Sequence, residues 1–333
     1  LAQRGKPHPI RKLTAGSPSS SPLLWAIDQA GPADHETVEL IQRLAKLKPQ
    51  KRIDSDPELS QMLKFWLDEA DARQPDDAYA LHCLAWAHAM PALASFVPAP
   101  LWCELLSHLT ETAEQAQQIQ ASDEPLVHQR LAGELPLTLS YALPELANCQ
   151  PLKRTARAAL SDGLDQLLDG EGLPHRRHLP ILRPLLACWT RACLLASRSK
   201  AVKLAAAART QYAYVVEQAL RLTRPDGTQT LADSPSRPTL PVDMIRTALT
   251  LIDDPECLAL AGQIFPGKLP PAAGSSPEPP DCPSANSEWA GFAMLRADWS
   301  STSPRLAVGY SGRKMETELI CGPDVVWSGR CQP

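Results

Sequence analysis

The stretch Ala219–Pro238, ALRLTRPDGTQTLADSPSRP, marks the end of one helix and the start of a polar loop. Alanine and leucine recur at helical spacing up to Arg224, and Pro225 then ends the helix because it has no amide hydrogen to donate. Asp226 and Gly227 follow as a strong turn pair. Such pairs usually only separate two elements, so the surrounding sequence must indicate whether this loop carries chemistry.

Length and charge limit the class of protein. The chain has 333 residues, which is enough for a large core and for two domains. Its formal net charge of -4 gives no bulk attraction to nucleic acid or to a membrane surface. No apolar run reaches the roughly 18–20 residues that cross a bilayer. We therefore expect neither a nucleic-acid partner nor a membrane span.

The two ends of the sequence indicate a piece of a longer protein, because it begins with Leu1 and stops at Pro333 within strand-like sequence. The continuation, the oligomeric state and the compartment are left open. The nine cysteines form no Cys-x-x-Cys pair, which argues against a zinc site. Their odd number and wide spacing favour reduced thiols over a disulfide framework. We expect no metal and no cofactor.

Apolar residues at helical spacing predict a long series of helices. They cover about 35–48, 57–70, 75–90, 99–120, 151–169, 181–198, 201–224 and 241–265, the last as two short helices. Between them, residues 124–147 should form one kinked helix or two short ones, because Pro136 and Pro144 interrupt the pattern. Glu134 is the only carboxylate in the apolar middle of that segment, and it is either a buried polar group or a surface one.

Composition also predicts the domain layout. Residues 1–31 form an irregular arm with an apolar anchor at Leu23–Ile27, and residues 32–265 form the helical domain. Residues 266–287 are a Pro-rich linker that is too poor in apolar side chains to fold alone. Residues 288–333 alternate as strands do and form the start of a truncated β-sandwich domain.

This order, helices and then strands, indicates an all-α domain joined to an antiparallel β-sandwich. The first expected strand, Trp289–Trp299, places Gly291, Ala293 and Leu295 on one face. A solenoid of helix pairs would repeat at roughly 34 or 40 residues, and no such repeat is present. The remaining architecture is an incomplete α/α toroid, whose inner helices line a cleft. The fold class is therefore mainly α.

The most concentrated basic cluster lies in the loop Leu173–Pro180. It holds His175, Arg176, Arg177 and His178, and Arg183 follows one turn further on. Guanidinium groups bind carboxylate and sulfate with two parallel hydrogen bonds. The cluster is either a site for an anionic ligand or a solvated loop.

Two short patterns resemble one known family. The helix, the Pro-Asp-Gly turn and Ser234-Pro235-Ser236 are similar to a loop of the heparinase II/III and alginate lyase family. The run Gly291-Phe292, Arg296 and Trp299 resembles the Gly-aromatic-x-x-x-Arg-x-x-Trp pattern that opens the family's β domain, and Leu306–Tyr310 resembles its second strand. The resemblance implies an incomplete α/α toroid followed by the first strands of an antiparallel β-sandwich.

The sequence departs from that family at two places. The loop's catalytic Tyr is replaced by Ser236 and Arg237, and the usual His-x-His-x-Asp stretch is replaced by Ser311–Glu318, which contains no His. No catalytic residue can therefore be carried over, and the resemblance gives no metal site. By chemistry alone, the candidates for acid or base are Tyr212, Tyr214, His175 and His178. The candidates for binding an anionic substrate are Arg176, Arg177, Arg183 and Arg237.

The resemblance implies a polysaccharide lyase homologue that acts on or binds a uronic-acid polysaccharide, with β-elimination as the reaction. That reaction needs a group that neutralises the uronate carboxylate, a base and an acid. The alternative is a non-catalytic carbohydrate-binding or helical interaction protein on a lyase scaffold. We expect the ligand, an anionic polysaccharide, where the loops 175–180 and 225–237 approach each other at one mouth of the helical domain. Family members are often periplasmic or secreted, whereas the cysteine pattern favours reduced thiols.

Overall fold

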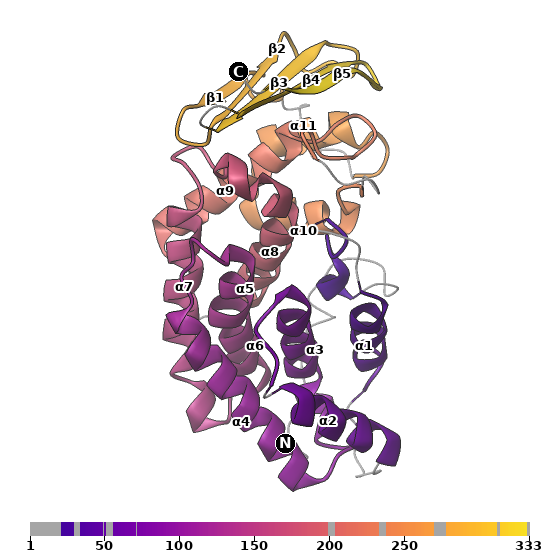
Figure 1. The fold of residues 1–333 in the computed structure, drawn as a ribbon, viewed down its shortest axis with the longest axis vertical. Coiled ribbons are helices and arrows are strands. Elements are labelled where there is room, and N and C mark those ends of the chain that lie inside the picture. Colours follow the sequence, from indigo (N-terminus) through magenta and orange to yellow (C-terminus); the bar gives the residue numbers. More distant parts are fainter. Residues whose placement is uncertain are drawn as a thin grey trace. The chain divides into compact units, whose positions relative to one another are not determined.

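In the computed structural model, a series of helices precedes one antiparallel sheet (Figure 1). The structure describes residues 21–29, 34–48, 50, 56–70, 72–198, 204–232, 238–269, 278–311 and 314–331. The α-helices are α1 (His35–Ala45), α2 (Pro57–Ala70), α3 (Asp77–Leu93), α4 (Ala99–Gln115), α5 (Pro125–His128), α6 (Leu135–Ala142), α7 (Leu152–Gln166), α8 (Leu182–Arg198), α9 (Ala206–Arg221), α10 (Val242–Ile252) and α11 (Pro255–Ile264). The shorter helical segments are η2 (Pro22–Leu24), η3 (Ala116–Gln118), η4 (Gln129–Glu134), η5 (Ala147–Cys149) and η6 (Arg176–Ile181). The strands are β1 (Ala285–Ser287), β2 (Phe292–Arg296), β3 (Arg305–Ser311), β4 (Lys314–Cys321) and β5 (Asp324–Cys331).

The predicted helices are confirmed, and they differ from the prediction only at their ends. Capping explains why they begin where they do. The Asp34 carboxylate accepts hydrogen bonds from the amides of Glu36 and Thr37 at the start of α1. Asp254 does the same at the start of α11, where Pro255 occupies the first helical position. The apolar anchor before α1 is also confirmed, since Leu23 and Trp25 are buried.

The interrupted segment 124–147 consists of α5, the π-helix η4 and α6. Pro136 has no amide hydrogen to donate to the carbonyl of Ala132, and the turns before it widen into the π-helix. The side-chain amide of Gln117 donates to that carbonyl instead, at 2.9 Å. A polar side chain from a neighbouring helix thus satisfies the backbone group that the proline leaves free.

The chain divides into two compact units. Unit 1 holds η2, α1 to α6, α7 as far as Gly163, and α8 from Arg191 onward. Unit 2 holds the end of α7, η6, α8 as far as Thr190, α9 to α11 and all five strands. The sheet therefore belongs to the same unit as the last helices, and the division does not follow the predicted linker.

Unit 1 is built around α3, which is apolar on all sides and contacts α1, α4 and α6. Trp86, Met90 and Leu93 of α3 are fully buried. Glu134, at the end of η4, is fully buried as well, and this decides between the two possibilities left by the sequence. Its two carboxylate oxygens accept from Nε and Nη2 of Arg191 at 2.5 and 2.8 Å.

The sheet in unit 2 has the strand order β1-β2-β3-β4-β5, and all neighbours are antiparallel. The predicted linker is too long at its C-terminal end, because β1 lies within it and pairs with β2. The expected first strand is too long at its N-terminal end, because residues 288–291 form a turn before β2. The buried face of β2 carries Phe292 and Met294, whereas Leu295 on the predicted face is exposed.

One helical stretch in the described part of the chain, Arg176–Ser197, is long and apolar enough to span a membrane. Its most apolar window is 89% buried within the protein. Leu185, Leu186 and Trp189 in this stretch belong to the core. Burial of this kind is what a core helix of a folded domain requires.

Candidate functional site

The Pro-Asp-Gly loop of unit 2 is a closed and well-bonded turn. Thr223 and Gln229 form an isolated β-bridge across it. The Asp226 carboxylate accepts from the amide and the hydroxyl of Thr228 at 2.8 and 2.7 Å. Gly227 has a φ of 86°, which a residue with a side chain rarely adopts. The turn thus has one defined shape, and it leads directly into the segment that resembles the lyase loop.

Arg183 holds this turn from inside. Its Nη1 donates to the side chain of Gln29 and to the carbonyl of Pro238, both at 3.0 Å. Its Nη2 donates to the Thr223 hydroxyl at 3.2 Å and to the Gly227 carbonyl at 3.1 Å. Burial lowers the pKa of Arg183 to about 9. The guanidinium predicted to bind substrate therefore positions the turn instead.

Arg224 and Glu318 connect the turn to the sheet. The Arg224 guanidinium donates through Nε and Nη2 to the two carboxylate oxygens of Glu318, at 2.8 and 2.5 Å. Oε2 of Glu318 also accepts from the amide of Leu231 at 3.1 Å. Both charged side chains are buried. Glu318 lies in β4, in the stretch where the resembling family has its His-x-His-x-Asp pattern.

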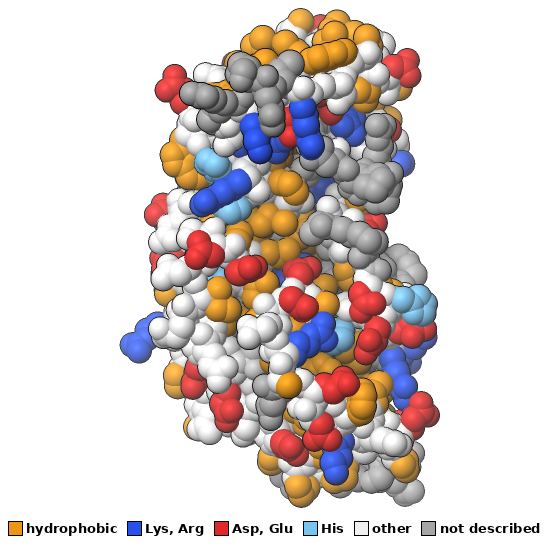
Figure 2. All heavy atoms as spheres, in the orientation of Figure 1, with side chains coloured by type: hydrophobic (Ala, Val, Ile, Leu, Met, Phe, Trp, Pro, Cys, Tyr) orange, Lys and Arg blue, Asp and Glu red, His pale blue; other side chains and the backbone are white. Residues whose placement is uncertain are grey.

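A second charged group lies two residues earlier on β4. Glu316 is paired with Arg176 of η6, and with Nε of Arg330 of β5 at 2.8 Å. Arg176 passes directly over Gly309 of β3, where an added Cβ would lie 2.3 Å from its Nε. Gly309, Glu316 and Arg330 are direct neighbours across three strands. We call Arg176, Glu316 and Arg330 the charged row. Figure 2 shows Lys and Arg side chains gathered beside the strands, with an acidic side chain among them.

The other basic residues of the predicted cluster lie next to this row on η6. Arg177 is exposed and donates through Nε to Nε2 of His178 at 3.0 Å. Burial lowers the pKa of His178 to about 4, and burial with the nearby Arg177 also lowers the pKa of His175. Both imidazoles are therefore neutral at pH 7. Nε2 of His178 already accepts the hydrogen bond from Arg177.

The two loops expected to approach each other do so, because Nε2 of Gln229 donates to the carbonyl of Leu179 at 2.8 Å.

The two tyrosine candidates differ in their surroundings. Tyr212 is buried and donates to the hydroxyl of Thr190 at 3.0 Å, whereas Tyr214 is 41% exposed. Arg237 lies outside the described residues.

Sequence reasoning missed the carboxylates of the site. The sequence marks Ser311–Glu318 by its lack of histidine, which assigns no role to Glu316 and Glu318. Their spacing of two in a strand puts both side chains on one face, opposite Arg176 and Arg224. The signal that could have found them is this alternation of two carboxylates along a strand, together with Arg224 directly before the Pro-Asp-Gly turn.

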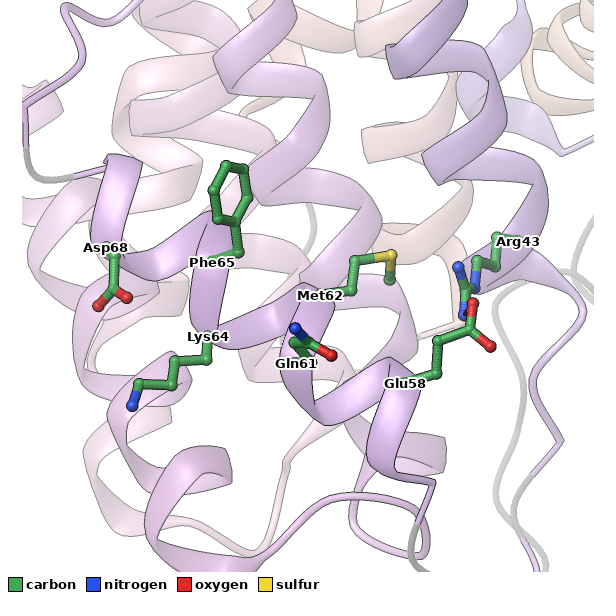
Figure 3. A pocket seen from close by; sticks show the side chains of 7 residues that line it. All are labelled: Arg43, Glu58, Gln61, Met62, Lys64, Phe65 and Asp68. Atoms are coloured by element: carbon green, nitrogen blue, oxygen red, sulfur yellow. Dashed lines mark hydrogen bonds and ion pairs between the residues drawn. The ribbon is translucent and has the colours of Figure 1, made fainter.

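Unit 1 also has a shallow hollow on its surface (Figure 3). It lies on α2 between Glu58 and Asp68, with Arg43 of α1 at one end. Figure 3 shows that only Arg43 and Glu58 face each other, and these two form an exposed ion pair. Lys64 and Asp68 point away from them. The groups do not converge on one point, so the charged row is the better candidate.

Histidines in both units predict that the fold is sensitive to acid. In unit 1, burial lowers the pKa of His88 to about 4, and its Nε2 has no hydrogen-bond partner among the described residues. Trp66 donates to Nδ1 of His82, so the proton of this neutral ring lies on Nε2 and faces the hydroxyl of Thr37. Burial lowers the pKa of His82 as well.

Because these folded-state pKa values lie below the unfolded value near 6.5, stability is complete above pH 6.5 and is lost as the pH falls toward 4. His88 alone should contribute a loss of about 3 kcal/mol over that range. Urea unfolding at pH 7 and pH 4.5 measures the loss. A His88→Gln variant should show a smaller difference between the two pH values, and an equal difference would contradict the assignment.

The fold is similar to that of known heparan-degrading lyases. A heparinase III structure with methylated lysines matches with a TM-score of 0.54 and 12% identity, over 88% of this chain and 46% of that one. A mutant of heparan sulfate lyase HepC from Pedobacter heparinus matches with a TM-score of 0.55 and 14% identity, over 95% of this chain and 59% of that one. No family profile and no curated protein sequence matches the chain. The chain spans about half the length of these lyases. It has the heparinase-like fold, an α/α toroid followed by antiparallel strands, and this confirms the expected fold class.

Proposed function

We propose that this chain, which has the heparinase-like fold, binds an acidic polysaccharide of the uronic-acid type at the charged row of unit 2. The observation that carries the proposal is the arrangement of Arg176 and Arg330 on either side of the Glu316 carboxylate. The pair of guanidinium groups is already arranged around a carboxylate, which is the group that a uronate presents. Exposed Arg177 adds a further positive charge next to Arg176 in the chain.

The electrostatics of the row suit an acidic chain. The three side chains of the row sum to one positive charge, and exposed Arg177 adds a second. The Arg330 side chain is 62% exposed, so a ligand can reach it from solvent. An exposed ion pair of this kind contributes only about 0.2–1 kcal/mol. Binding therefore depends on several contacts and weakens as salt screens them.

A second candidate function is β-elimination itself, and the neutral His175 favours it. An imidazole with a lowered pKa can accept a proton at neutral pH, while arginines neutralise the uronate carboxylate. The acid would have to come from a tyrosine, and Tyr214 is the exposed candidate. Lyase activity would release an unsaturated uronate, which absorbs in the ultraviolet. Absorbance that grows with time on a uronate polymer, and that a His175→Ala variant lacks, would establish elimination.

The binding proposal is tested by retention on an immobilised uronate polymer such as heparan sulfate. The Arg177→Ala, Arg330→Ala double variant should bind roughly 2- to 30-fold more weakly, from two exposed contacts of about 0.2–1 kcal/mol each. It should elute at lower salt, with unchanged circular dichroism. The matched control is Arg43→Ala, which removes a partly exposed arginine from α1 in unit 1. Equal elution of the double variant and wild type would refute the site, as would an equal loss in the control.

A further inference from the structure

We infer that Trp289, with His175 packed against it, is a stacking platform for one pyranose ring of the acidic polysaccharide. This inference rests on the proposed binding function and names a subsite for it. Trp289 lies in the turn between β1 and β2 and is 49% exposed. Its ring is perpendicular to that of His175, with the ring centres 5.8 Å apart. A single exposed tryptophan is not unusual, so the argument depends on how this one is held and what lies beside it.

The turn that carries Trp289 is held firmly. The amide of Arg176 donates to the carbonyl of Ala290, and the amide of Tyr310 donates to the carbonyl of Gly291, both at 2.7 Å. The Ser287 hydroxyl accepts from the amide of Ala290 at 3.1 Å. These bonds fix the backbone on both sides of Trp289, while half of its side chain remains in solvent.

Gly291 shows how closely the turn is packed. It has a φ of 63°, and an added Cβ would lie 2.3 Å from the carbonyl oxygen of Tyr310. Only glycine satisfies both conditions. A rigid aromatic ring loses little conformational entropy when a ligand covers it, which favours binding.

The platform and the charged row are continuous. Trp289 contacts His175, the residue before Arg176, and the turn is bonded to the Arg176 amide. Three residues after Trp289, Phe292 begins a cross-strand line that continues through Gly309 and Glu316 to Arg330. With strands about 4.8 Å apart, this line is about 14 Å long. Phe292 and Gly309 on this line are buried, so an extended ligand would contact the indole at one end and the exposed guanidinium groups of Arg177 and Arg330 beyond it.

The chemistry of a uronate fits this order of groups. A pyranose ring has an apolar face of C–H groups and carries its carboxylate at the ring edge. The face of an indole is electron-rich and attracts the positive ends of C–H groups. His175 is neutral at pH 7 because burial and Arg177 lower its pKa, so it adds a polar, uncharged edge beside the ring. A stacked uronate would then direct its acidic group toward the arginines of η6.

Isothermal titration with a heparan sulfate tetrasaccharide tests the platform. Trp289→Ala should weaken binding roughly 2- to 10-fold, the range of an aromatic contact, whereas Trp289→Phe should keep most of it. The matched control is Trp327→Ala, since Trp327 of β5 is 46% exposed. The dependence of the affinity on salt should stay as in wild type in Trp289→Ala, and it should fall in the Arg177→Ala, Arg330→Ala variant.

Binding by wild type and Trp289→Ala with equal affinity would overturn the platform and leave the proposed function standing. An equal loss in Trp327→Ala would also overturn it, because the effect would then not be specific to this turn. Absence of binding by wild type to both a heparan sulfate and an alginate oligosaccharide would overturn the proposed function together with the platform.

Discussion

Replacing Glu134 with leucine is expected to destabilise unit 1 by about 3–5 kcal/mol, the usual cost of breaking a buried ion pair on one side. The Arg191 guanidinium would then remain buried without the carboxylate that accepts from its Nε and Nη2. The side chain of Glu134 is fully buried, so water cannot replace it. Urea unfolding of the variant, followed by circular dichroism, measures the loss.

The Glu134→Leu, Arg191→Leu double variant provides the matched control. Removing both charges leaves no unpaired ion, and an apolar pair is often as stable as the buried ion pair it replaces. The double variant should therefore be more stable than either single variant, and the coupling energy of the double-mutant cycle should be favourable. If the two single losses simply added, the ion pair would not account for the cost.

Replacing Glu318 with glutamine is expected to have the second large effect, and a local one. The substitution leaves the buried Arg224 without its counter-charge and weakens the acceptor for the Leu231 amide. A stability loss of about 3–5 kcal/mol is expected. Because Glu318 joins the Pro-Asp-Gly turn to β4, amide exchange should accelerate most at the turn amides of Arg224, Thr228 and Leu231.

The control for this prediction is Glu256→Gln, which makes the same chemical change at an exposed carboxylate on α11. It should change the free energy of unfolding by no more than a few tenths of a kcal/mol. The amide exchange rates of the turn should stay as in wild type. Uniform acceleration across unit 2 in Glu318→Gln, without preference for the turn, would contradict a positioning role for Glu318. Weaker binding of a uronate polymer by this variant would in turn connect the turn to the proposed function.

The two buried pairs differ in what they hold together. Arg191 and Glu134 join helical segments of unit 1, at the π-helix that Pro136 induces. Arg224 and Glu318 join a turn to a strand within unit 2. Burying either charged side chain of a pair without the other is strongly unfavourable in free energy. The pairs therefore select one arrangement of their elements, because any other arrangement leaves a buried charge without a partner.

Local patterns in the sequence determined where this chain is helical and where it is extended. Apolar spacing, the cap at Asp34, the proline at 136 and the Pro-Asp-Gly turn are each read from a few neighbouring residues, and the structure has a helix end or kink at each. These features depend on backbone hydrogen bonds within one element, which is why a single sequence suffices to predict them. The resemblance of two short motifs to the heparinase II/III and alginate lyase family predicted the heparinase-like architecture.

Only the tertiary structure decided what the charged residues do. Arg224 and Glu318 are 94 positions apart, and Arg191 and Glu134 are 57 apart. The sequence predicted Arg183 as a ligand-binding group, and the structure bonds it to four acceptors of its own unit. A charge is stable in the core only if a distant segment brings a partner to it. Packing between distant segments therefore determines which arginines are buried and which face solvent. A local sequence pattern does not predict this.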